Sequence, residues 1–397
     1  MSDINPFQGG GPFEDIMRNL ARMFTTQGPV NWELATQFAV WAATGGTTEP
    51  NVDPVSRVRL EELLRVAEIH VADATGLLTS GELLQVRAVT PSEWARLALE
   101  AWRPLLERLA RAMAETLPTG ADEPPAEADE SNPMAQLFGQ LPQMLGPVLF
   151  GMQAGSMVGQ LGRRALGTYD LPMPWPASDR LVFVPPNIER FAADWSLDPD
   201  DVRLWVCVRE VAYHAVLGRP HVRARLDELI GAYVDAFQPD GRAIEDRLSG
   251  VDPSDMGAMQ SLFSDPSALL GEMQSDAQRR LKVPLRALLA VVAGYVDYVM
   301  DTVGRRLIAG YNPLTEALRR RRLEDSSGAK ALGQLLGVEL DGADYERGLA
   351  FVHGVLERAG SEGLDRLWRS AKELPTPPEV DAPGLWLARI DLDVDES

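Results

Sequence analysis

The sequence predicts a mainly α-helical protein with at most a small β element near residues 181–184. Apolar residues recur at i, i+3, i+4 and i+7 through several long segments, which is the spacing of an amphipathic helix. Glycine and proline punctuate these segments at intervals that suit helix ends. Only residues 181–184, a short apolar run closed by two prolines, have the length and composition of a strand.

The first third of the chain contains four expected helices. They cover residues 12–25, 31–43, 54–76 and 91–116. We expect residues 1–116 to form an N-terminal helical subregion. Residues 117–133 are rich in proline, acidic and small residues and offer nothing that could pack, so they predict a disordered loop. Residues 134–397 are left for a helical core, and the chain length allows one compact unit.

Residues 131–162 carry no charge, and Gly151, Gly155 and Gly159 repeat along one helical face. A membrane span with a small-residue packing face is one interpretation. However, glutamines and two prolines interrupt the segment, and aromatic anchors are missing at its ends. We therefore predict a buried helix in close backbone contact with a neighbour, with a partner-binding surface as the alternative.

Residues 199–217 predict a buried helix. Proline and two aspartates open the segment, and Gly218 and Pro220 close it. Almost every position between them is apolar, and a helix that is apolar on all sides belongs inside a protein. The exceptions to this apolar pattern form a polar island of four residues: Arg209, Glu210, Tyr213 and His214. Burial of such polar groups is costly unless each is paired.

The polar island resembles the zinc-binding helix motif H-E-x-x-H. In that motif two histidines at i and i+4 hold zinc, and the glutamate acts as general base. Here Arg209 and Tyr213 stand at the histidine places and only Glu210 matches. His214 follows one residue too late to complete the pair.

Further segments resemble one protein family in their order along the chain. They are Gly28-Pro29-Val30-Asn31-Trp32, Arg65-Val66-Ala67-Glu68 with Asp73-Ala74-Thr75, Gln160-Leu161-Gly162, Tyr169-Asp170-Leu171, and Leu374-Pro375-Thr376 with Glu379, Pro383, Trp386 and Arg389. With the 199–217 helix, they make the chain similar to the actinobacterial zincin-like metallopeptidase family. Members of that family are assigned as hydrolases, and some relatives are named for an association with deazaflavin coenzyme biosynthesis. The resemblance implies a zincin-like helical fold over most of the chain.

The resemblance also implies where the zinc ligands of active members lie. Active-looking members carry H-E-x-x-H-H and a later L-x-E-G-[HY] helix, whose glutamate is the third ligand. The later pattern falls in an expected helix over residues 284–309. The matching positions here are Arg209 and Tyr213 for the two histidines, Glu210 for the base, His214 for the extra histidine, Ala293 for the ligand glutamate and Tyr295 for the closing residue.

The family implies zinc as cofactor, but these side chains do not suit it. Arginine stays protonated and alanine has no donor atom, while Tyr213 could bind only as phenolate. We predict no metal here, with Glu210 a vestigial general base. We also expect Arg209 to bridge to a carboxylate in place of the metal. The candidate partner is Asp297, four residues after Ala293 on the same helical face.

The favoured function is a catalytically inactive member that acts by binding an unidentified protein or peptide. One alternative is an active metal-dependent peptidase or hydrolase with the non-standard set Glu210, His214 and His221. A second is a structural partner that assembles through the uncharged helix 134–162, in which case a homo-oligomer is possible.

Composition argues against several classes of partner and location. The net charge of −20 argues against nucleic acid and anionic membrane surfaces as partners. The longest basic run, residues 319–322, is followed by Glu324 and Asp325 and predicts a solvated helix end. The single cysteine, Cys207, cannot form an internal disulfide and is expected in the core. With no secretion signal or membrane span expected, the predicted location is the cytoplasm.

Overall fold

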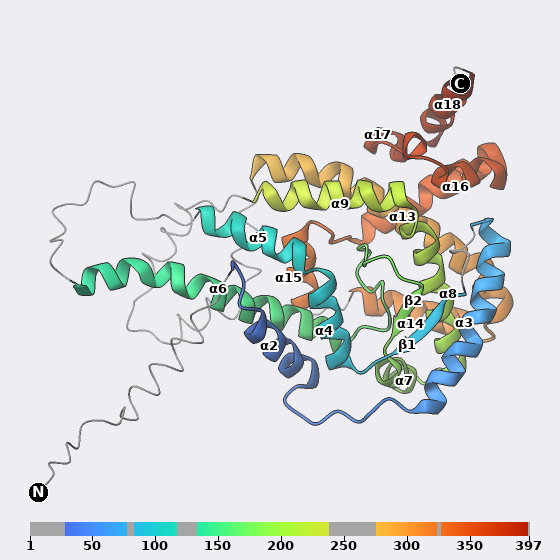
Figure 1. The fold of residues 1–397 in the computed structure, drawn as a ribbon. Helices are drawn as coiled ribbons and strands as arrows, with labels where there is room; N and C mark the ends of the chain where they lie inside the picture. Colours follow the sequence, from blue (N-terminus) through green and yellow to red (C-terminus); the bar gives the residue numbers. More distant parts are fainter. Residues whose placement is uncertain (1–27, 78–82, 117–132, 238–274, 324–326, 396–397) are drawn as a thin grey trace, which may run out of the picture.

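A computed structural model describes residues 28–77, 83–116, 133–237, 275–323 and 327–395 of the chain. Helices make up most of these segments, so the prediction of a mainly α protein is confirmed (Figure 1). The expected helix over residues 12–25 lies outside the described residues. So does the predicted disordered loop over 117–133, except for its final residue, which begins a helix.

The first half of the chain contains five described helices and one strand. They are α2 (Trp32–Thr44), α3 (Pro54–Thr75), β1 (Gln85–Ala88), α4 (Pro91–Ala101), α5 (Arg103–Thr116) and α6 (Pro133–Gly162). Side chains at the N-caps begin several of them: Asn31 accepts from the amide of Leu34 at 3.1 Å. The predicted helix over 91–116 is two helices, because the backbone leaves helical geometry at Trp102.

The glycines of α6 permit very close contact with α2. A Cβ atom on Gly155 would lie 2.1 Å from the carbonyl oxygen of Ala35, and one on Gly159 would lie 2.3 Å from that of Ala39. Gly151 meets the Asn31 carbonyl in the same way. The four-residue repeat on α6 therefore matches a four-residue repeat on α2, and the predicted close backbone contact with a neighbouring helix is confirmed.

The second half contains the helix of interest and the C-terminal helices. The elements are β2 (Arg180–Phe183), α7 (Pro185–Asp194), α8 (Pro199–Leu217), α9 (Pro220–Asp235), α13 (Asp276–Leu307), α14 (Tyr311–Leu323), α15 (Ser327–Leu336), α16 (Gly342–Asp365), η1 (Arg366–Trp368), η2 (Ala371–Glu373), α17 (Pro377–Asp381) and α18 (Pro383–Asp395). α8 has its predicted bounds. α13 begins before the predicted residue 284, because Ser275 and Gln278 form a capping box there and Pro284 is accommodated inside the helix.

A small parallel sheet joins the two halves. β2 lies where a strand was predicted, and it pairs in parallel with β1, from Gln85 opposite Arg180 to Ala88 opposite Phe183. The sequence did not predict β1. Its residues, Gln-Val-Arg-Ala, are only half buried and give little apolar signal.

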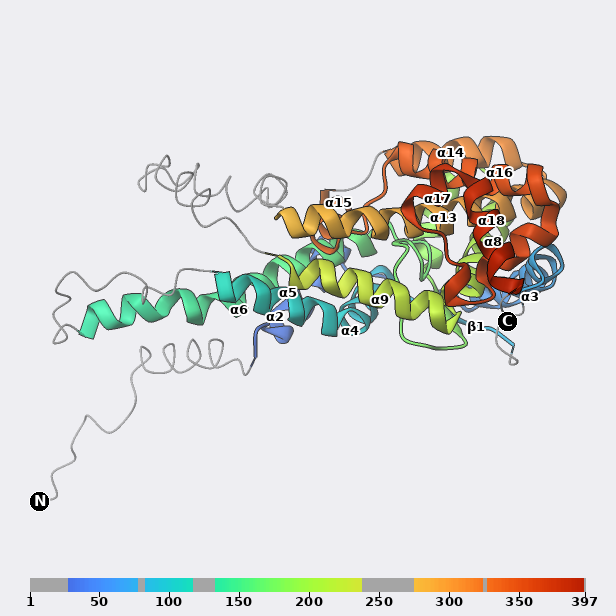
Figure 2. The same cartoon turned by 90° about the horizontal axis from the view of Figure 1, so that it is seen from above.

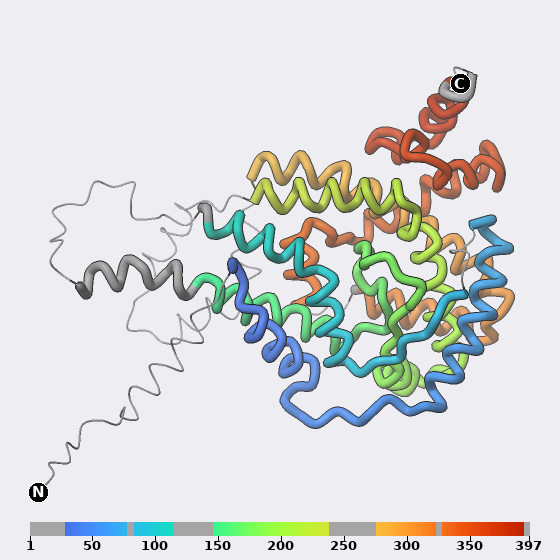
Figure 3. Tube along the Cα trace, viewed as in Figure 1, coloured from blue at the N-terminus to red at the C-terminus, as the bar shows by residue number. Residues whose placement is uncertain are grey.

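α8 occupies the centre of the molecule. It packs between α3 and α13, and α16 covers another side of α13. α9 and α13 run side by side (Figure 1, Figure 3), and the C-terminal helices lie at the end of the molecule away from α6, with α16 packed along α13 (Figure 2). One set of buried apolar residues extends from Ala35 to Ile390 and includes Cys207, as predicted. The site described below lies on α8, most of whose residues are buried.

Among the described residues, α13 is the one helix long and apolar enough to cross a membrane by length and composition. Of its most apolar window, 72% is buried against the rest of the protein. A central helix of a globular core meets the same criteria.

Candidate functional site

The candidate site is built on α8. Asp198 caps the helix by accepting from the amides of Asp200 and Asp201 at 2.9 and 3.0 Å. The apolar residues of α8 fill the space between α3 and α13, which carries the polar island inward. The side chain of Glu210 is fully buried and that of Arg209 is 13% exposed. Tyr213 and His214 are buried as well.

A loop over residues 163–171, here called the site loop, covers the polar island. Trp94 donates its indole N–H to the carbonyl of Gly167 at 2.8 Å. The hydroxyl of Thr168 accepts from the amide of Val182 in β2, also at 2.8 Å. These bonds fix the backbone of the site loop against α4 and the small sheet. The loop can then present its peptide groups to α8 at defined positions.

The carboxylate of Glu210 lies directly beneath the site loop. Its Oε2 atom accepts from the amide of Tyr169 at 3.0 Å. A Cβ atom on Gly167 would lie 2.4 Å from Cδ of Glu210, so this close approach needs a glycine. Burial raises the pKa of Glu210 to about 7, while the charge of Arg209 and amides of the site loop favour the ionised form.

Arg209 turns inward and binds both Glu210 and the site loop. Its Nη1 atom lies 3.0 Å from Oε1 of Glu210, and its Nη2 donates to the carbonyl of Tyr169 at 2.8 Å. The guanidinium carbon lies 4.8 Å from the centre of the Tyr213 ring. Burial acts to lower the pKa of Arg209, but the neighbouring Tyr213, Glu210 and Asp170 hold it above its ordinary value. The side chain therefore remains a cation.

The predicted bridge from Arg209 to Asp297 is wrong. Asp297 instead accepts two hydrogen bonds from Arg322 of α14, at 2.7 and 3.0 Å. The carboxylate that pairs with Arg209 is Glu210. The sequence could not indicate this, because adjacent residues of a helix do not normally face each other.

His214 is engaged by Tyr169. Its Nδ1 atom lies 3.0 Å from the hydroxyl of Tyr169, and burial lowers the pKa of the imidazole. The ring of Tyr169 also stacks on that of Tyr213, with centroids 5.8 Å apart. Tyr169 thus contacts every member of the island, through its backbone to Arg209 and Glu210 and through its ring to the other two.

His221 lies beyond the end of α8, in the first turn of α9. Its Nε2 atom is buried without a hydrogen-bond partner, and burial lowers its pKa. No hydrogen bond joins it to Glu210 or to His214 among the described contacts. In the part of the chain that the structure describes, no group of three or more His, Cys, Asp or Glu residues could hold a metal ion.

Ala293 and Tyr295 lie on α13, which packs against α8. Ala293 is buried and offers only a methyl group. Tyr295 packs edge-on against Trp368, with centroids 5.3 Å apart, and burial raises its pKa beyond the physiological range. Neither residue supplies a ligand where the family pattern has one.

The residues at the matched positions do not fit a zinc ion. A catalytic zinc needs three protein ligands and an open position for water. Here the three ligand positions hold a paired guanidinium, a phenol whose pKa is raised far above neutral by burial, and a methyl group. The Arg209 guanidinium is held by Glu210 and by the Tyr169 carbonyl.

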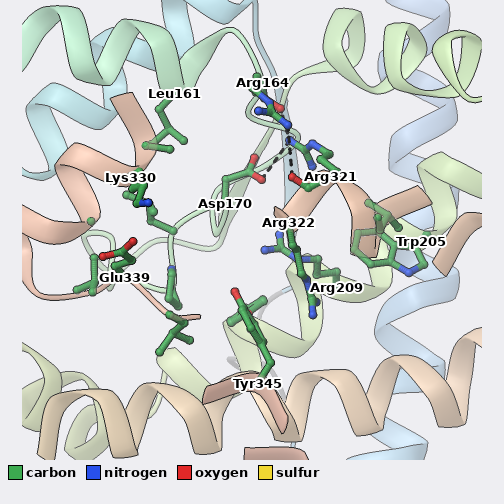
Figure 4. A pocket seen from close by; sticks show the side chains of 18 residues that line it. Leu161, Arg164, Asp170, Trp205, Arg209, Arg321, Arg322, Lys330, Glu339 and Tyr345 are labelled. Carbon is green, nitrogen blue, oxygen red and sulfur yellow. Dashed lines mark hydrogen bonds and ion pairs between the residues drawn. The ribbon is translucent and has the colours of Figure 1, made fainter. Parts of the chain in front are cut away.

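A cleft opens beside Arg209, and its outline takes in about 990 Å³ of non-atom space, part of which is open solvent. Basic side chains from four elements converge on it, as Figure 4 shows. They are Arg164 from the site loop, Arg209 from α8, Arg321 and Arg322 from α14, and Lys330 from α15. Trp205, Tyr213 and Tyr345 also line the cleft, with two carboxylates, Asp170 and Glu339.

The sequence did not predict this cleft. The basic run at 319–322 was expected to be a solvated helix end, and this is correct only for Arg319 and Arg320, which are exposed. Arg321 and Arg322 turn inward, with 18% and 33% of their side chains exposed. A helix turns about 100° per residue, so four consecutive arginines can point partly to solvent and partly into the cleft.

Three comparisons with known proteins bear on this fold. Residues 30–387 match the model of a family described as zincin-like metallopeptidase. A crystal structure from Chloroflexus aurantiacus, described as a "putative hydrolase with a novel fold", is similar with a TM-score of 0.60 and 23% sequence identity. The similarity covers 91% of this chain and 99% of the other and, at this identity, concerns the fold alone. The comparison with curated proteins gives no match.

Proposed function

This chain belongs to the zincin-like metallopeptidase family, and we propose that it is a non-catalytic member that acts by binding. The proposal assigns the polar island of α8 a structural role and the neighbouring cleft the binding role.

The main support for the proposal is the burial and bonding of the Glu210 carboxylate. A general base must reach a water or substrate within hydrogen-bond distance. Glu210 is fully buried, bonded to Arg209 and to the Tyr169 amide, and is not among the residues that line the cleft. Arg209 is the member of this pair that does line it. A carboxylate sealed behind an arginine has no route to a substrate.

The Arg209 guanidinium supports the same proposal on electrostatic grounds. Removal of a metal leaves nearby carboxylates without a cation, and a buried unpaired carboxylate is strongly destabilising. Arg209 supplies that cation from within the chain. It also ties α8 to the site loop through the Tyr169 carbonyl. Its proposed role is to preserve the fold that the metal would otherwise hold.

The two alternative functions have less support. A metal site made of Glu210, His214 and His221 would need Glu210 to give up its bonds, because its two carboxylate oxygens already pair with Arg209 and with the Tyr169 amide. Assembly through helix 134–162 would need a free glycine face, whereas Gly151, Gly155 and Gly159 already contact α2 within the chain.

A hydrolysis assay tests the proposal. The full chain is incubated with a mixed fluorogenic peptide library, with and without one equivalent of zinc, beside its Glu210→Gln variant. We expect both proteins to give the background rate under both conditions. Zinc-dependent hydrolysis that the Glu210→Gln substitution abolishes would establish an active metallopeptidase.

A further inference from the structure

The lining of the cleft carries more cations than carboxylates, although the chain as a whole is acidic. The sequence has 58 acidic and 38 basic residues. Yet the side chains that line the cleft include five cations and two carboxylates, Asp170 and Glu339. A concentration of one sign of charge in a partly enclosed cleft raises the local concentration of the opposite ion.

Two of the cations meet at the base of the cleft. Arg209 and Arg322 lie close together in Figure 4, near the labelled Tyr345. Arg322 acts to lower the pKa of Arg209, as expected for neighbouring like charges. Each is anchored from behind by one carboxylate, Glu210 for Arg209 and Asp297 for Arg322. A guanidinium has five N–H donors, and these anchors leave donors of both groups for a ligand.

The upper wall of the cleft is held in place by reciprocal bonds. Arg321 donates to the backbone carbonyl of Arg164, and Arg164 donates back to that of Arg321 at 3.4 Å. Arg321 also lies 3.6 Å from Asp170. These contacts join α14 to the site loop and hold the Arg321 side chain at the cleft before any ligand arrives. Pre-organised donors bind more tightly because they lose less freedom on binding.

Lys330 stands on the opposite side of the cleft, at the start of α15. It is exposed, and no hydrogen bond or ion pair joins it to another described residue. An ammonium group on a flexible stem can follow a ligand oxygen that the fixed arginines do not reach. The remaining lining is apolar and includes Leu161, Leu171, Leu318, Val338 and Leu340.

We propose that this cleft binds a small organic molecule through a phosphate or carboxylate group, with the apolar part of the molecule on the leucine-rich wall. This deepens the proposed function, because it rests on the cleft having a binding role without catalysis. Arginine pairs recognise both oxyanions through planar, charge-assisted hydrogen bonds. The bound oxyanion also relieves the repulsion between Arg209 and Arg322.

Titration calorimetry of the full chain with pyrophosphate and, separately, with citrate tests the proposal. Sodium chloride at matched ionic strength corrects for general screening. We expect saturable binding of at least one probe, and the stronger probe identifies phosphate or carboxylate as the preferred group. If neither probe binds more than chloride does, the proposal is wrong.

Matched variants locate the binding. Lys330→Gln and Arg321→Gln remove charges from the cleft, whereas Arg319→Gln and Arg320→Gln remove equal charges from the solvent side of the same basic run. The cleft variants should weaken binding about tenfold or more, as for loss of a charged hydrogen bond, and the control variants less than twofold. If all four variants weakened anion binding equally, the binding would depend on the net charge of the protein, and the cleft would not be its site. Lys330 is exposed, so its variant should keep the wild-type melting temperature even if Arg321→Gln does not.

Zinc content is measured on portions of the same preparation that receive no probe, because pyrophosphate and citrate themselves chelate zinc. Saturable anion binding with no zinc supports both proposals, and no anion binding with no zinc overturns only the oxyanion proposal. Stoichiometric zinc would overturn the proposed function whatever the anion result.

Discussion

Arg209 and Glu210 are consecutive in α8, yet their side chains form an ion pair with Nη1 and Oε1 3.0 Å apart. Consecutive helical residues point about 100° apart. The pair forms because both side chains turn toward one residue of the site loop, Tyr169. Its amide donates to Glu210 and its carbonyl accepts from Arg209. The three residues make a closed ring of hydrogen bonds beneath the loop.

The first prediction concerns pH. The folded-state pKa of Glu210 is raised to about 7 from 4.5, so between these values the folded protein holds a proton that the unfolded chain has released. The contribution of Glu210 to stability therefore falls as pH rises from about 4.5 to about 7. The Glu210→Gln variant has no titrating group at this position, so its stability lacks this pH dependence. The free energy of unfolding of the variant minus that of wild type should therefore rise from about pH 4.5 to about pH 7 and level off at higher pH.

Urea unfolding at half-unit steps from pH 5 to pH 8 measures this difference. An offset between the two proteins is also expected, because the amide that replaces the carboxyl group changes the hydrogen bonds to Arg209 and to the Tyr169 amide. The surface variant Glu357→Gln serves as control and should follow wild type at every pH. A Glu210→Gln difference that stays flat from pH 5 to pH 8 would contradict the assigned burial.

A second prediction concerns the cover over Glu210. Gly167→Ala places a methyl group 2.4 Å from Cδ of Glu210, which forces the site loop away from α8. We expect a loss of about 1–3 kcal/mol in the free energy of unfolding, as for overpacking of a core. Gly342→Ala is the control, since no atom lies within 4 Å of its added Cβ. If urea unfolding gave the two variants equal stability, the site loop would not contact Glu210 at Gly167.

A third prediction tests the contact of α6 with α2. Gly155→Ala puts a Cβ atom 2.1 Å from the Ala35 carbonyl oxygen, so the two helices must separate. The melting temperature should fall by several degrees, corresponding to about 1–3 kcal/mol. Gly146→Ala, on the same helix but with no atom within 4 Å, should be neutral or slightly stabilising. The reverse order of the two melting temperatures would refute the packing.

A fourth prediction restores the ligands that the family pattern implies. The triple variant Arg209→His, Tyr213→His and Ala293→Glu places two imidazoles one turn apart on α8 and a carboxylate on the adjacent α13. We expect it to bind one zinc ion per chain, because these are the donors that such a site requires. The double variant without Ala293→Glu should bind zinc more weakly. Failure of a folded triple variant to bind zinc would show that α8 and α13 no longer have the ligating arrangement.

The sequence predicted the helices well where local signals were strong. The bounds of α8 were predicted from the proline and two aspartates of its first turn and from Gly218, and the close contact of α6 from its glycine repeat. These features depend on residues that are close in the sequence, so they can be predicted from the sequence alone. β1 lacked a signal, because its formation depends on pairing with β2, about a hundred residues away.

The sequence predicted that the polar island is buried, but it did not predict the partners of its side chains. Burial of the polar island followed from the apolar sequence of α8, whereas the pairing of Arg209 with Glu210 depends on the site loop. Arg322 competes for Asp297, and nothing local indicates that a residue of α14 reaches α13. The cleft depends in the same way on helices that tertiary packing brings together. At 319–322 the first two arginines are exposed and the last two turn inward, and four identical residues give no local signal that separates them.

The central claim is that the Arg209–Glu210 pair stands where a zinc ion would otherwise lie. Elemental analysis of the full chain, purified without chelators and equilibrated with one equivalent of zinc before exhaustive dialysis, tests it directly. The account predicts zinc far below one ion per chain, and the same low content in Glu210→Gln and His214→Ala. One zinc ion per wild-type chain, lost on either substitution, would contradict it.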